Sequence, residues 1–318
     1  MHWWNVIIFT VYQIIVILTI IHMILDNKQP AKTMAWALVI WFVPIVGIVF
    51  YLFFGINTRK ERHVSERSMN QLTKRSMLEF VEQKNLRLPE SHKPLIDLFI
   101  NQNLALPFKD NKVDIYTDGY QFFPALLQEI SKAKSHIHVG MYIFAEDALG
   151  YLLSDALIDK RREGVEVRVI YDDVGCWNVR RRFFERMREE GIEVVPFMPV
   201  HFPSFTSKVN YRNHRKIIVI DGQVGFIGGM NIALRYVKGT GEQPWRDTML
   251  RVSGGVVNAL QRTFLVDWYF VDRTVLSDRK YYPRCEPMND CLAQVVTSGP
   301  VTPYPEIMQG YVRVILAA

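Results

Sequence analysis

A histidine and a lysine separated by one residue, His214 and Lys216, are the side chains of this sequence best suited to covalent chemistry. Neutral imidazole can attack phosphorus and form a covalent intermediate, which splits one difficult displacement into two easier steps. An ammonium group beside it stabilises the phosphate oxygens while negative charge develops on them. The pair therefore predicts phosphoryl transfer through a phosphohistidine.

The residues after this pair complete the motif His-x-Lys-x4-Asp-x6-Gly-Gly-x-Asn, which occurs once in the chain. Gly228 and Gly229 allow the backbone to approach a ligand closely. Asn231, near the start of a short predicted helix, is placed to donate to the same phosphate oxygens. Gly229 and Asn231 are therefore predicted phosphate-binding residues, and this set of side chains requires no metal ion or other cofactor.

Three acidic residues accompany the catalytic pair, and their predicted roles differ. Asp221 completes the catalytic motif, but it lies seven residues past His214 and across a buried strand. We therefore expect Asp221 to fix local structure and not to contact substrate. A base or nucleophile of this kind is usually oriented by a third group. Asp247 is the first candidate for the acid that orients His214, and Glu242 is the second.

Two apolar runs without Asp, Glu, Lys or Arg lie near the start of the chain, at about residues 3–25 and 35–56. Each is longer than the roughly 20 residues that a helix needs to cross a bilayer. The first run lacks the basic start and the cleavage site of a signal peptide. Residues 1–57 are therefore predicted to form a two-helix transmembrane hairpin. Basic residues are more frequent after the second run than in the connector, which predicts that both termini are cytoplasmic.

The charge of the chain predicts an anionic partner. The net charge is +6, which suits either a phospholipid surface or a nucleic acid. Two membrane spans next to the basic region favour lipid and argue against nucleic acid. Cys176, Cys285 and Cys291 form no even disulfide framework, consistent with a reducing compartment. The sequence thus predicts a multi-pass plasma-membrane protein with a cytoplasmic catalytic domain facing anionic lipid.

Strand-like and helix-like segments alternate after residue 112. This alternation predicts an α/β fold with a mixed, mostly parallel sheet and helices packed on both faces. Asp221-Gly222 predicts a hairpin turn within that sheet. The predicted strands lie at 113–116, 136–144, 165–171, 192–196, 216–220, 224–227 and 247–252, and the predicted helices at 122–134, 149–163, 179–190, 231–236 and 256–271.

The motif in these surroundings resembles that of the phospholipase D superfamily, and more narrowly that of the bacterial cardiolipin synthases. Further segments that carry the resemblance are 225–232, 244–248, 261–269 and 297–300. The resemblance implies a phospholipase D-like fold. It also implies transfer of a phosphatidyl group from one phosphatidylglycerol to another, giving cardiolipin and glycerol. In that reaction His214 would be the nucleophile, and Lys216 and Asn231 would bind phosphate.

The superfamily carries a second His-Lys-Asp motif whose histidine protonates the leaving alcohol, whereas no histidine follows His214 here. We therefore expect that the second catalytic half, which would supply that motif, is missing. A homodimer that brings in a second His214 is the alternative. The expected domains are the hairpin at 1–57, a charged linker or interfacial segment at 58–112, a first phospholipase D-like domain at 113–296, and the truncated start of a second one at 297–318.

Other interpretations stay open at this point. Water in place of a lipid acceptor would make the protein a phospholipid hydrolase, and the missing motif allows an inactive membrane protein. His136 and His138 share a strand face and are expected to be structural or to line a pocket. Asp172 ends a predicted strand, where α/β folds place ligand sites. One cluster of arginines has two possible roles, as a solvated helix face or as a contact for anionic lipid headgroups. Its members are Arg180, Arg181, Arg182, Arg186 and Arg188.

Overall fold

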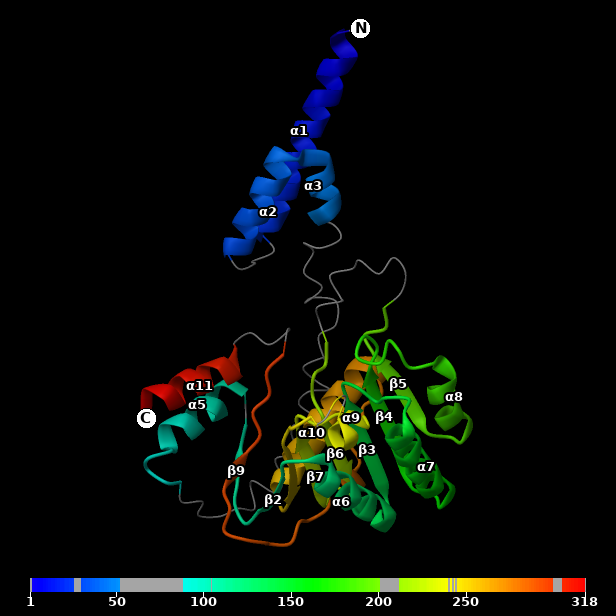
Figure 1. The fold of residues 1–318 in the computed structure, drawn as a ribbon. Coiled ribbons are helices and arrows are strands. Elements are labelled where there is room, and N and C mark those ends of the chain that lie inside the picture. The colour runs from blue at the N-terminus through cyan, green and yellow to red at the C-terminus, as the bar shows by residue number, and fades with distance from the viewer. Residues whose placement is uncertain are drawn as a thin grey trace. The chain divides into compact units, whose positions relative to one another are not determined.

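The computed structural model describes residues 2–25, 30–51, 88–103, 105–200, 212–239, 241, 243, 245–299 and 305–317 (Figure 1). The chain divides into two compact units. One comprises Met1–His63 with Val200–Tyr211, and the other comprises Val64–Pro199 with Arg212–Ala318. All residues of the candidate site that the structure describes belong to the second unit.

The first unit contains three apolar helices, α1 (His2–Leu25), α2 (Pro30–Phe42) and α3 (Pro44–Phe50). Within α1, residues Val6–Leu25 are long and apolar enough to cross a membrane. The second predicted span, at 35–56, is not continuous in the described residues, because α2 ends at Phe42. Pro44 stands two residues further on and cannot donate the backbone hydrogen bond that would continue the helix. Residues 52–56 lie outside the described part of the chain.

The three apolar helices pack against one another. Val16, Met23, Ile40 and Tyr51 form a small buried cluster in which Met23 and Ile40 are completely inaccessible. Gly47 of α3 lies against α2, and a Cβ atom placed on it would be only 2.8 Å from the carbonyl oxygen of Val39. A glycine is therefore needed for this close approach of α3 to α2.

The second unit is built on a seven-stranded sheet in the order β2-β8-β7-β6-β3-β4-β5. β3, β4 and β5 pair in parallel, and the other neighbours pair antiparallel. β6 and β8 therefore run against the other five strands of this sheet, which confirms the predicted mixed, mostly parallel sheet. The strands are β2 (Lys112–Tyr116), β3 (His136–Met141), β4 (Glu166–Asp172), β5 (Glu193–Phe197), β6 (Ile217–Ile220), β7 (Val224–Gly228) and β8 (Met249–Ser253).

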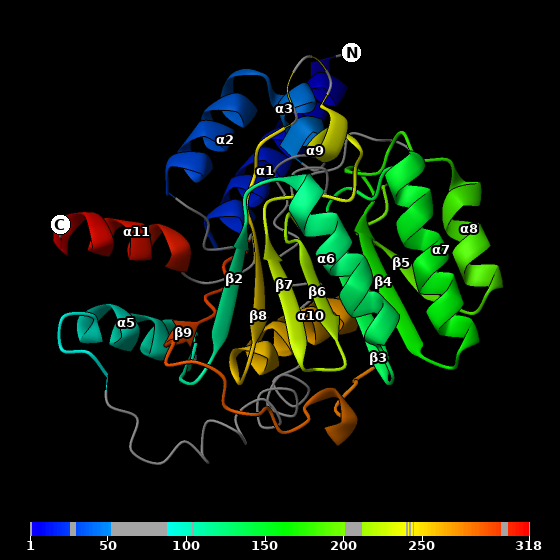
Figure 2. The same cartoon turned by 60° about the horizontal axis from the view of Figure 1, so that its bottom comes forward.

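Helices cover both faces of this sheet, as predicted (Figure 2). α6 (Gly119–Lys132), α7 (Ala148–Arg162) and α8 (Arg181–Glu189) lie on one face, and α10 (Val256–Asp272) lies on the other. The alternation of side chains along β3 explains the two layers. Ile137 and Val139 join the core under α6 and α7, whereas His136 and His138 point towards α10, where they contact Gln261.

The predicted hairpin between β6 and β7 is present and positions the start of β6. Asp221 and Gly222 both have left-handed backbones, with φ values of 52° and 64°. Glycine and aspartate tolerate this conformation better than most residues, which is why Asp-Gly favours such a tight turn. The hairpin fixes β6 between β3 and β7, so the residues that precede Ile217 emerge beside the end of β3.

Part of the segment predicted as a charged linker or interfacial segment, 58–112, forms regular elements of the second unit. α5 (Lys93–Asn103) contacts α11 (Glu306–Ala317), and β1 (Pro107–Phe108) pairs with β9 (Ala293–Gln294). Gly310 of α11 lies so close to Phe99 of α5 that a Cβ atom there would be 2.3 Å from the ring. These tertiary contacts hold segments that have little periodicity of their own. Residues 58–87 lie outside the described part of the chain.

Candidate active site

His214 and Lys216 stand just before β6 and contact each other. The Nζ atom of Lys216 lies 3.1 Å from Nδ1 of His214 and donates to the carbonyl oxygen of His214 over 2.7 Å. The imidazole is exposed, whereas Lys216 is only 3% exposed. The structure therefore brings an accessible imidazole next to a buried ammonium group, which is the pair that the sequence singled out.

Tyr142, which directly follows β3, packs against both members of this pair. The ring centroids of Tyr142 and His214 are 4.5 Å apart. The Nζ atom of Lys216 lies 5.2 Å from the centroid of the tyrosine ring, within the range of a cation–π contact. Tyr142 thus forms one wall beside the imidazole and limits its movement on the β3 side.

The surroundings shift the pKa values of both groups downward. Burial is the main cause at His214, and the charge of Lys216 adds to it, whereas Asp172 and Asp247 oppose the shift. Burial lowers the pKa of Lys216 to about 8, against the opposing charge of Asp247. At neutral pH the imidazole is therefore predominantly neutral and the lysine predominantly charged. These are the protonation states that covalent phosphoryl transfer requires.

Asn231 connects the motif to the loop after β3. Its side chain is 5% exposed. The Oδ1 atom accepts from the backbone N–H of Ile143 over 2.9 Å, and Nδ2 donates to the Tyr236 hydroxyl over 2.9 Å. An amide nitrogen carries two hydrogens, so one N–H remains for a ligand oxygen. Asn231 therefore fixes the loop after β3 to α9 (Arg235–Lys238) and is also a candidate donor to a phosphate oxygen.

The backbone of Gly229 lies in close contact with the side chain of Asp247, where a larger residue would not fit. A Cβ atom at Gly229 would lie 1.9 Å from Oδ1 of Asp247. The backbone N–H of Gly229 donates to the carbonyl oxygen of Thr248 over 2.8 Å. The predicted phosphate contact from Gly229 would therefore have to replace this hydrogen bond.

Asp247 acts on the catalytic pair through its charge. It opposes the downward pKa shifts of both His214 and Lys216. Its Oδ1 atom accepts from the backbone N–H of Thr248 over 2.7 Å. Within the described ranges no hydrogen bond joins Asp247 to His214, so the orienting role expected for it stays a prediction. Glu242, the second candidate, lies outside the described residues.

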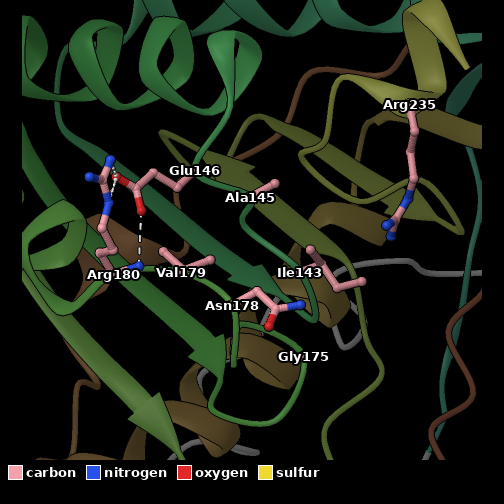
Figure 3. A pocket seen from close by; sticks show the side chains of 8 residues that line it. All are labelled: Ile143, Ala145, Glu146, Gly175, Asn178, Val179, Arg180 and Arg235. Atoms are coloured by element: carbon pink, nitrogen blue, oxygen red, sulfur yellow. Dashed lines mark hydrogen bonds and ion pairs between the residues drawn. The ribbon is translucent and has the colours of Figure 1, made fainter. Parts of the chain in front are cut away.

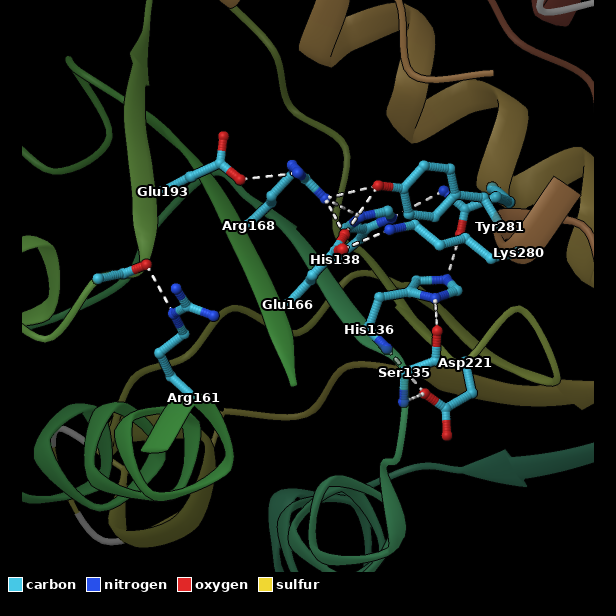
Figure 4. A network of polar contacts seen from close by, with 12 residues as sticks. Ser135, His136, His138, Arg161, Glu166, Arg168, Glu193, Asp221, Lys280 and Tyr281 are labelled. Carbon is cyan, nitrogen blue, oxygen red and sulfur yellow. Dashed lines mark hydrogen bonds and ion pairs between the residues drawn. The ribbon is translucent and has the colours of Figure 1, made fainter. Parts of the chain in front are cut away.

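Asp221 anchors the turn after β6 to the start of β3 (Figure 4). Its carboxylate accepts from the backbone N–H groups of Lys134, Ser135 and His136 over 2.8 to 2.9 Å. These three hydrogen bonds link the turn after β6 to the start of the neighbouring strand β3. The contacts support the structural role that we expected for Asp221.

Two further carboxylates hold the residues on either side of His214. Oδ2 of Asp172 accepts from the backbone N–H of Asn213 over 3.1 Å. Asp267 accepts from Nδ2 of Asn213 over 2.9 Å and from Nη1 of Arg215 over 2.5 Å. The imidazole is therefore carried by a segment that is fixed from both sides. Asp172 was recognised only as a strand end, and Asp267 was missed. The available signal was an acidic residue on the buried side of α10, where the other buried polar residues, Asn258, Gln261 and Thr263, are uncharged.

His136 and His138 belong to a buried polar network (Figure 4). Gln261 bridges them, at 3.2 Å from Nε2 of His136 and 2.8 Å from Nδ1 of His138. Tyr281 lies against both rings, at centroid distances of 5.0 and 5.3 Å. Among the described residues no cluster of three or more His, Cys, Asp or Glu side chains suits a metal ion. The network is structural, as one of the sequence interpretations proposed.

The arginine cluster near α8 is largely neutralised by carboxylates. Arg181 pairs with Glu185 at 2.7 Å. Arg180 pairs with Glu146, and Arg186 pairs with Asp155. These contacts favour a solvated helix face over a dedicated site for anionic headgroups at this cluster.

Comparison with known proteins places this fold and site in a class. Residues 126–268 match the family described as "Cardiolipin synthase, PLD-like domain", and residues 14–55 match the one described as "Phospholipase_D-nuclease N-terminal". The motif-bearing β6, the strands on either side of it and most of α10 lie inside the first match. The second unit is therefore a phospholipase D-like domain.

Similarity to complete sequences narrows the class. The cardiolipin synthase of Oceanobacillus iheyensis is 39% identical over 305 residues, which cover 92% of this chain and 63% of that protein. The major cardiolipin synthase ClsA of Bacillus subtilis is 37% identical over 314 residues, which cover 94% of this chain and 64% of that protein. The chain is similar to these cardiolipin synthases over nearly all of its own length, and it spans less than two thirds of the length of these relatives.

Solved structures are more distant. Phosphatidylserine synthase from Haemophilus influenzae is 17% identical, with a TM-score of 0.42 over 71% of this chain and 47% of that one. NucT from Helicobacter pylori is 15% identical, with a TM-score of 0.39 over 51% of this chain and 98% of that one.

Proposed function

We propose that this chain forms the first half of a phosphatidyltransferase that makes cardiolipin and glycerol from two phosphatidylglycerol molecules. The observation that carries the proposal is the contact between the accessible imidazole of His214 and the buried ammonium of Lys216, at 3.1 Å. Similarity to cardiolipin synthases supports the choice of phosphatidylglycerol as substrate.

In the first step, a nitrogen of His214 attacks the phosphorus of one phosphatidylglycerol. The bond between phosphorus and the terminal glycerol oxygen breaks, and that oxygen leaves as glycerol after it gains a proton. The product is a phosphatidyl group bound to the imidazole. Lys216 stabilises the charge on the phosphate oxygens in this step, because a phosphate oxygen can replace Nδ1 of His214 as a partner of its ammonium group.

In the second step, a hydroxyl group of a second phosphatidylglycerol attacks the phosphohistidine. The nitrogen–phosphorus bond breaks, the hydroxyl loses its proton, and His214 is regenerated. The depressed pKa of His214 supports both steps, because the imidazole must be neutral to attack and must leave readily. Water in place of the second lipid would give phosphatidic acid, so hydrolysis is the competing outcome.

The proton for the leaving glycerol needs a separate acid, which typically contributes about 10²–10⁴-fold in rate. This sequence contains one His-x-Lys-x4-Asp motif, and the relatives are longer than the chain. The proposed source of the acid is a second motif in a C-terminal half. A second copy of this chain, with its own His214, is the alternative source.

The first unit is proposed to anchor the enzyme in the plasma membrane. α1 contains a membrane-length apolar stretch, Val6–Leu25, and residues 14–55 match a family of phospholipase D N-terminal segments. The proposal includes a second crossing after α1 and a catalytic unit in the cytoplasm. This arrangement would hold His214 near the lipid headgroups that it attacks.

An assay in phosphatidylglycerol vesicles tests this function by mass spectrometry of the products. The chain is combined with a C-terminal half from a relative, which we call the two-half assay. The products of each variant chain are compared with those of the unchanged chain in this assay. Cardiolipin with free glycerol supports the transferase, phosphatidic acid supports the hydrolase, and neither product supports an inactive protein. His214→Ala and Lys216→Met should abolish product, whereas His92→Ala, at an exposed histidine of the same unit, should not. Product that survives His214→Ala contradicts the proposal.

A further inference from the structure

A polar pocket of about 570 Å³ opens beyond the carboxyl ends of β3 and β4, beside the motif but built from other residues (Figure 3). Its walls come from the loop after β3, the loop after β4, and α9 (Arg235–Lys238). The polar side chains that line it are those of Glu146, Asn178, Arg180 and Arg235. Its volume is within the range of roughly 300–1,000 Å³ that small-molecule sites occupy.

The pocket is joined to the catalytic motif by direct contacts. Ile143 lines it, and the backbone N–H of Ile143 donates to Asn231 of the motif. Gly175 also lines it, and a Cβ atom there would lie 2.1 Å from the carbonyl oxygen of Tyr142. Tyr142 in turn packs against the imidazole of His214. A molecule in the pocket would therefore be a neighbour of one bound at His214.

Arg235 brings a positive charge to the pocket that no carboxylate of the described residues balances. On one side Arg180 is paired with Glu146, so these two charges cancel. On the other side Arg235 extends from α9 towards the pocket. Its Nε atom is buried without a hydrogen-bond partner, and in the described part of the chain no carboxylate pairs with it. A buried charged donor without a partner is costly, and an anion in the pocket would remove that cost.

Aromatic residues pack against this arginine. The guanidinium carbon of Arg235 lies 4.5 Å from the ring centroid of Trp245 and 5.6 Å from that of Tyr236. Trp245 is 47% exposed, and Trp177, adjacent to the pocket residue Asn178, is 61% exposed. Exposed tryptophan is typical of surfaces that meet the polar–apolar boundary of a membrane. This favours a lipid headgroup over a soluble phosphate as the anion.

We propose that this pocket binds the glycerol phosphate headgroup of a second anionic phospholipid. Arg235 would contact the phosphodiester, while the Asn178 amide and the Glu146 carboxylate would contact the glycerol hydroxyls. The proposal rests on the proposed function, because that second lipid is the acceptor whose hydroxyl attacks the phosphohistidine. The pocket would hold the acceptor next to the reacting phosphorus and favour lipid transfer over hydrolysis.

Binding of glycerophosphoglycerol, the water-soluble headgroup, tests the proposal without turnover. The titration uses the full chain in detergent with Lys216→Met, which weakens binding at the motif and leaves the pocket intact. Adding Arg235→Gln should weaken the remaining binding roughly tenfold or more, since a hydrogen bond to a charged group contributes about that factor. Arg182→Gln, at an exposed arginine, changes the net charge equally and should have little effect. Inorganic phosphate should bind the pocket more weakly than glycerophosphoglycerol.

Unchanged affinity after Arg235→Gln, or an equal loss after Arg182→Gln, would overturn the proposal. Inorganic phosphate binding as tightly as glycerophosphoglycerol would also overturn it, in favour of a free-phosphate site. If Arg235→Gln gives no folded protein, Arg235→Lys replaces it, and it should bind glycerophosphoglycerol more weakly than the Lys216→Met form because lysine lacks the planar guanidinium fork; unchanged affinity would overturn the proposal. Because the titration needs no catalysis, a failure of the proposed function, such as product formation without His214, is recorded separately from this result.

Discussion

Lys216 donates to the carbonyl oxygen of His214 over 2.7 Å, while its ammonium nitrogen lies 3.1 Å from Nδ1 of the same residue. The lysine is thus held at the backbone of the residue that it assists. The position of its charge depends little on side-chain flexibility, because the lysine is also almost completely buried. Preorganised charge of this kind stabilises a transition state without reorganisation during the reaction.

Activity in the two-half assay should first rise and then fall as the pH increases. Activity should rise as the pH increases through the pKa of His214, which lies below its ordinary value of 6.5, because the imidazole becomes neutral. It should fall above pH about 8, where Lys216 loses its proton. Arginine stays protonated throughout this range, so Lys216→Arg should remove the alkaline decline even if the maximal rate is lower. An alkaline decline that persists in Lys216→Arg would assign it to another group.

Asp221 should matter more for stability than for chemistry. Asp221→Ala leaves three backbone N–H groups without their acceptor and places alanine at a φ of 52°. We expect the free energy of unfolding to fall by about 2–4 kcal/mol. Asp221→Asn keeps one acceptor oxygen and tolerates the left-handed backbone, so its loss should be smaller. Denaturation curves measure both, and activity per folded molecule of Asp221→Asn should stay close to that of the parent. Loss of activity in a fully folded Asp221→Asn protein would indicate a direct catalytic role.

Asp267 should act on catalysis through the position of His214. Asp267→Asn weakens the contacts to Asn213 and Arg215, which flank the imidazole. We expect a drop in kcat of roughly tenfold, with a smaller effect on KM. Asp159→Asn makes the same chemical change at a side chain that is 68% exposed, and it should leave the kinetics unchanged. A purely structural role for Asp267 would instead lower the melting temperature without altering kcat of the folded protein.

The buried histidine network should make stability fall under mildly acidic conditions. Burial lowers the pKa of His136 from 6.5 to about 4 and lowers that of His138 well below 6.5. Below pH 6.5 the unfolded chain therefore binds protons that the folded chain does not. The free energy of unfolding should decrease between pH 6.5 and about 4, on the order of 3 kcal/mol for His136.

Thermal unfolding of the full chain in detergent across this pH range measures the effect. His138→Asn should flatten the pH dependence, because it removes one buried proton-binding site. His92→Asn, at an exposed histidine, should leave the pH dependence as it is. Equal slopes in the parent and in His138→Asn would show that the network does not control stability in this range.

Much of the catalytic framework was predictable because local signals agreed with the final structure. The apolar run before Asp221 and the Asp-Gly turn predict β6 and its hairpin with β7, and with them the placement of His214 and Lys216 on one strand start. Asp267 was not predictable in this way. It lies 54 residues from Asn213, and only the packing of α10 beneath the sheet brings the two together.

Other differences from the sequence prediction have similar causes. The break at Pro44 falls inside an uninterrupted apolar run, so hydrophobicity alone predicts one continuous helix. β1 and β9 have two residues each, too few for a periodic pattern, and they are strands only because they pair with each other. Arg235 and its pocket depend on two loops and the short helix α9, which lie far apart in the sequence.

The most direct test of the account is to capture the covalent intermediate on His214. The chain, with an intact C-terminal half from a relative, is mixed with phosphatidylglycerol and quenched during the first turnover under alkaline conditions that preserve phosphohistidine. Peptide mass spectrometry should find the phosphatidyl group on His214, and no adduct should form in His214→Ala. An adduct on a different residue, or cardiolipin formed at the normal rate by His214→Ala, would contradict the central claim.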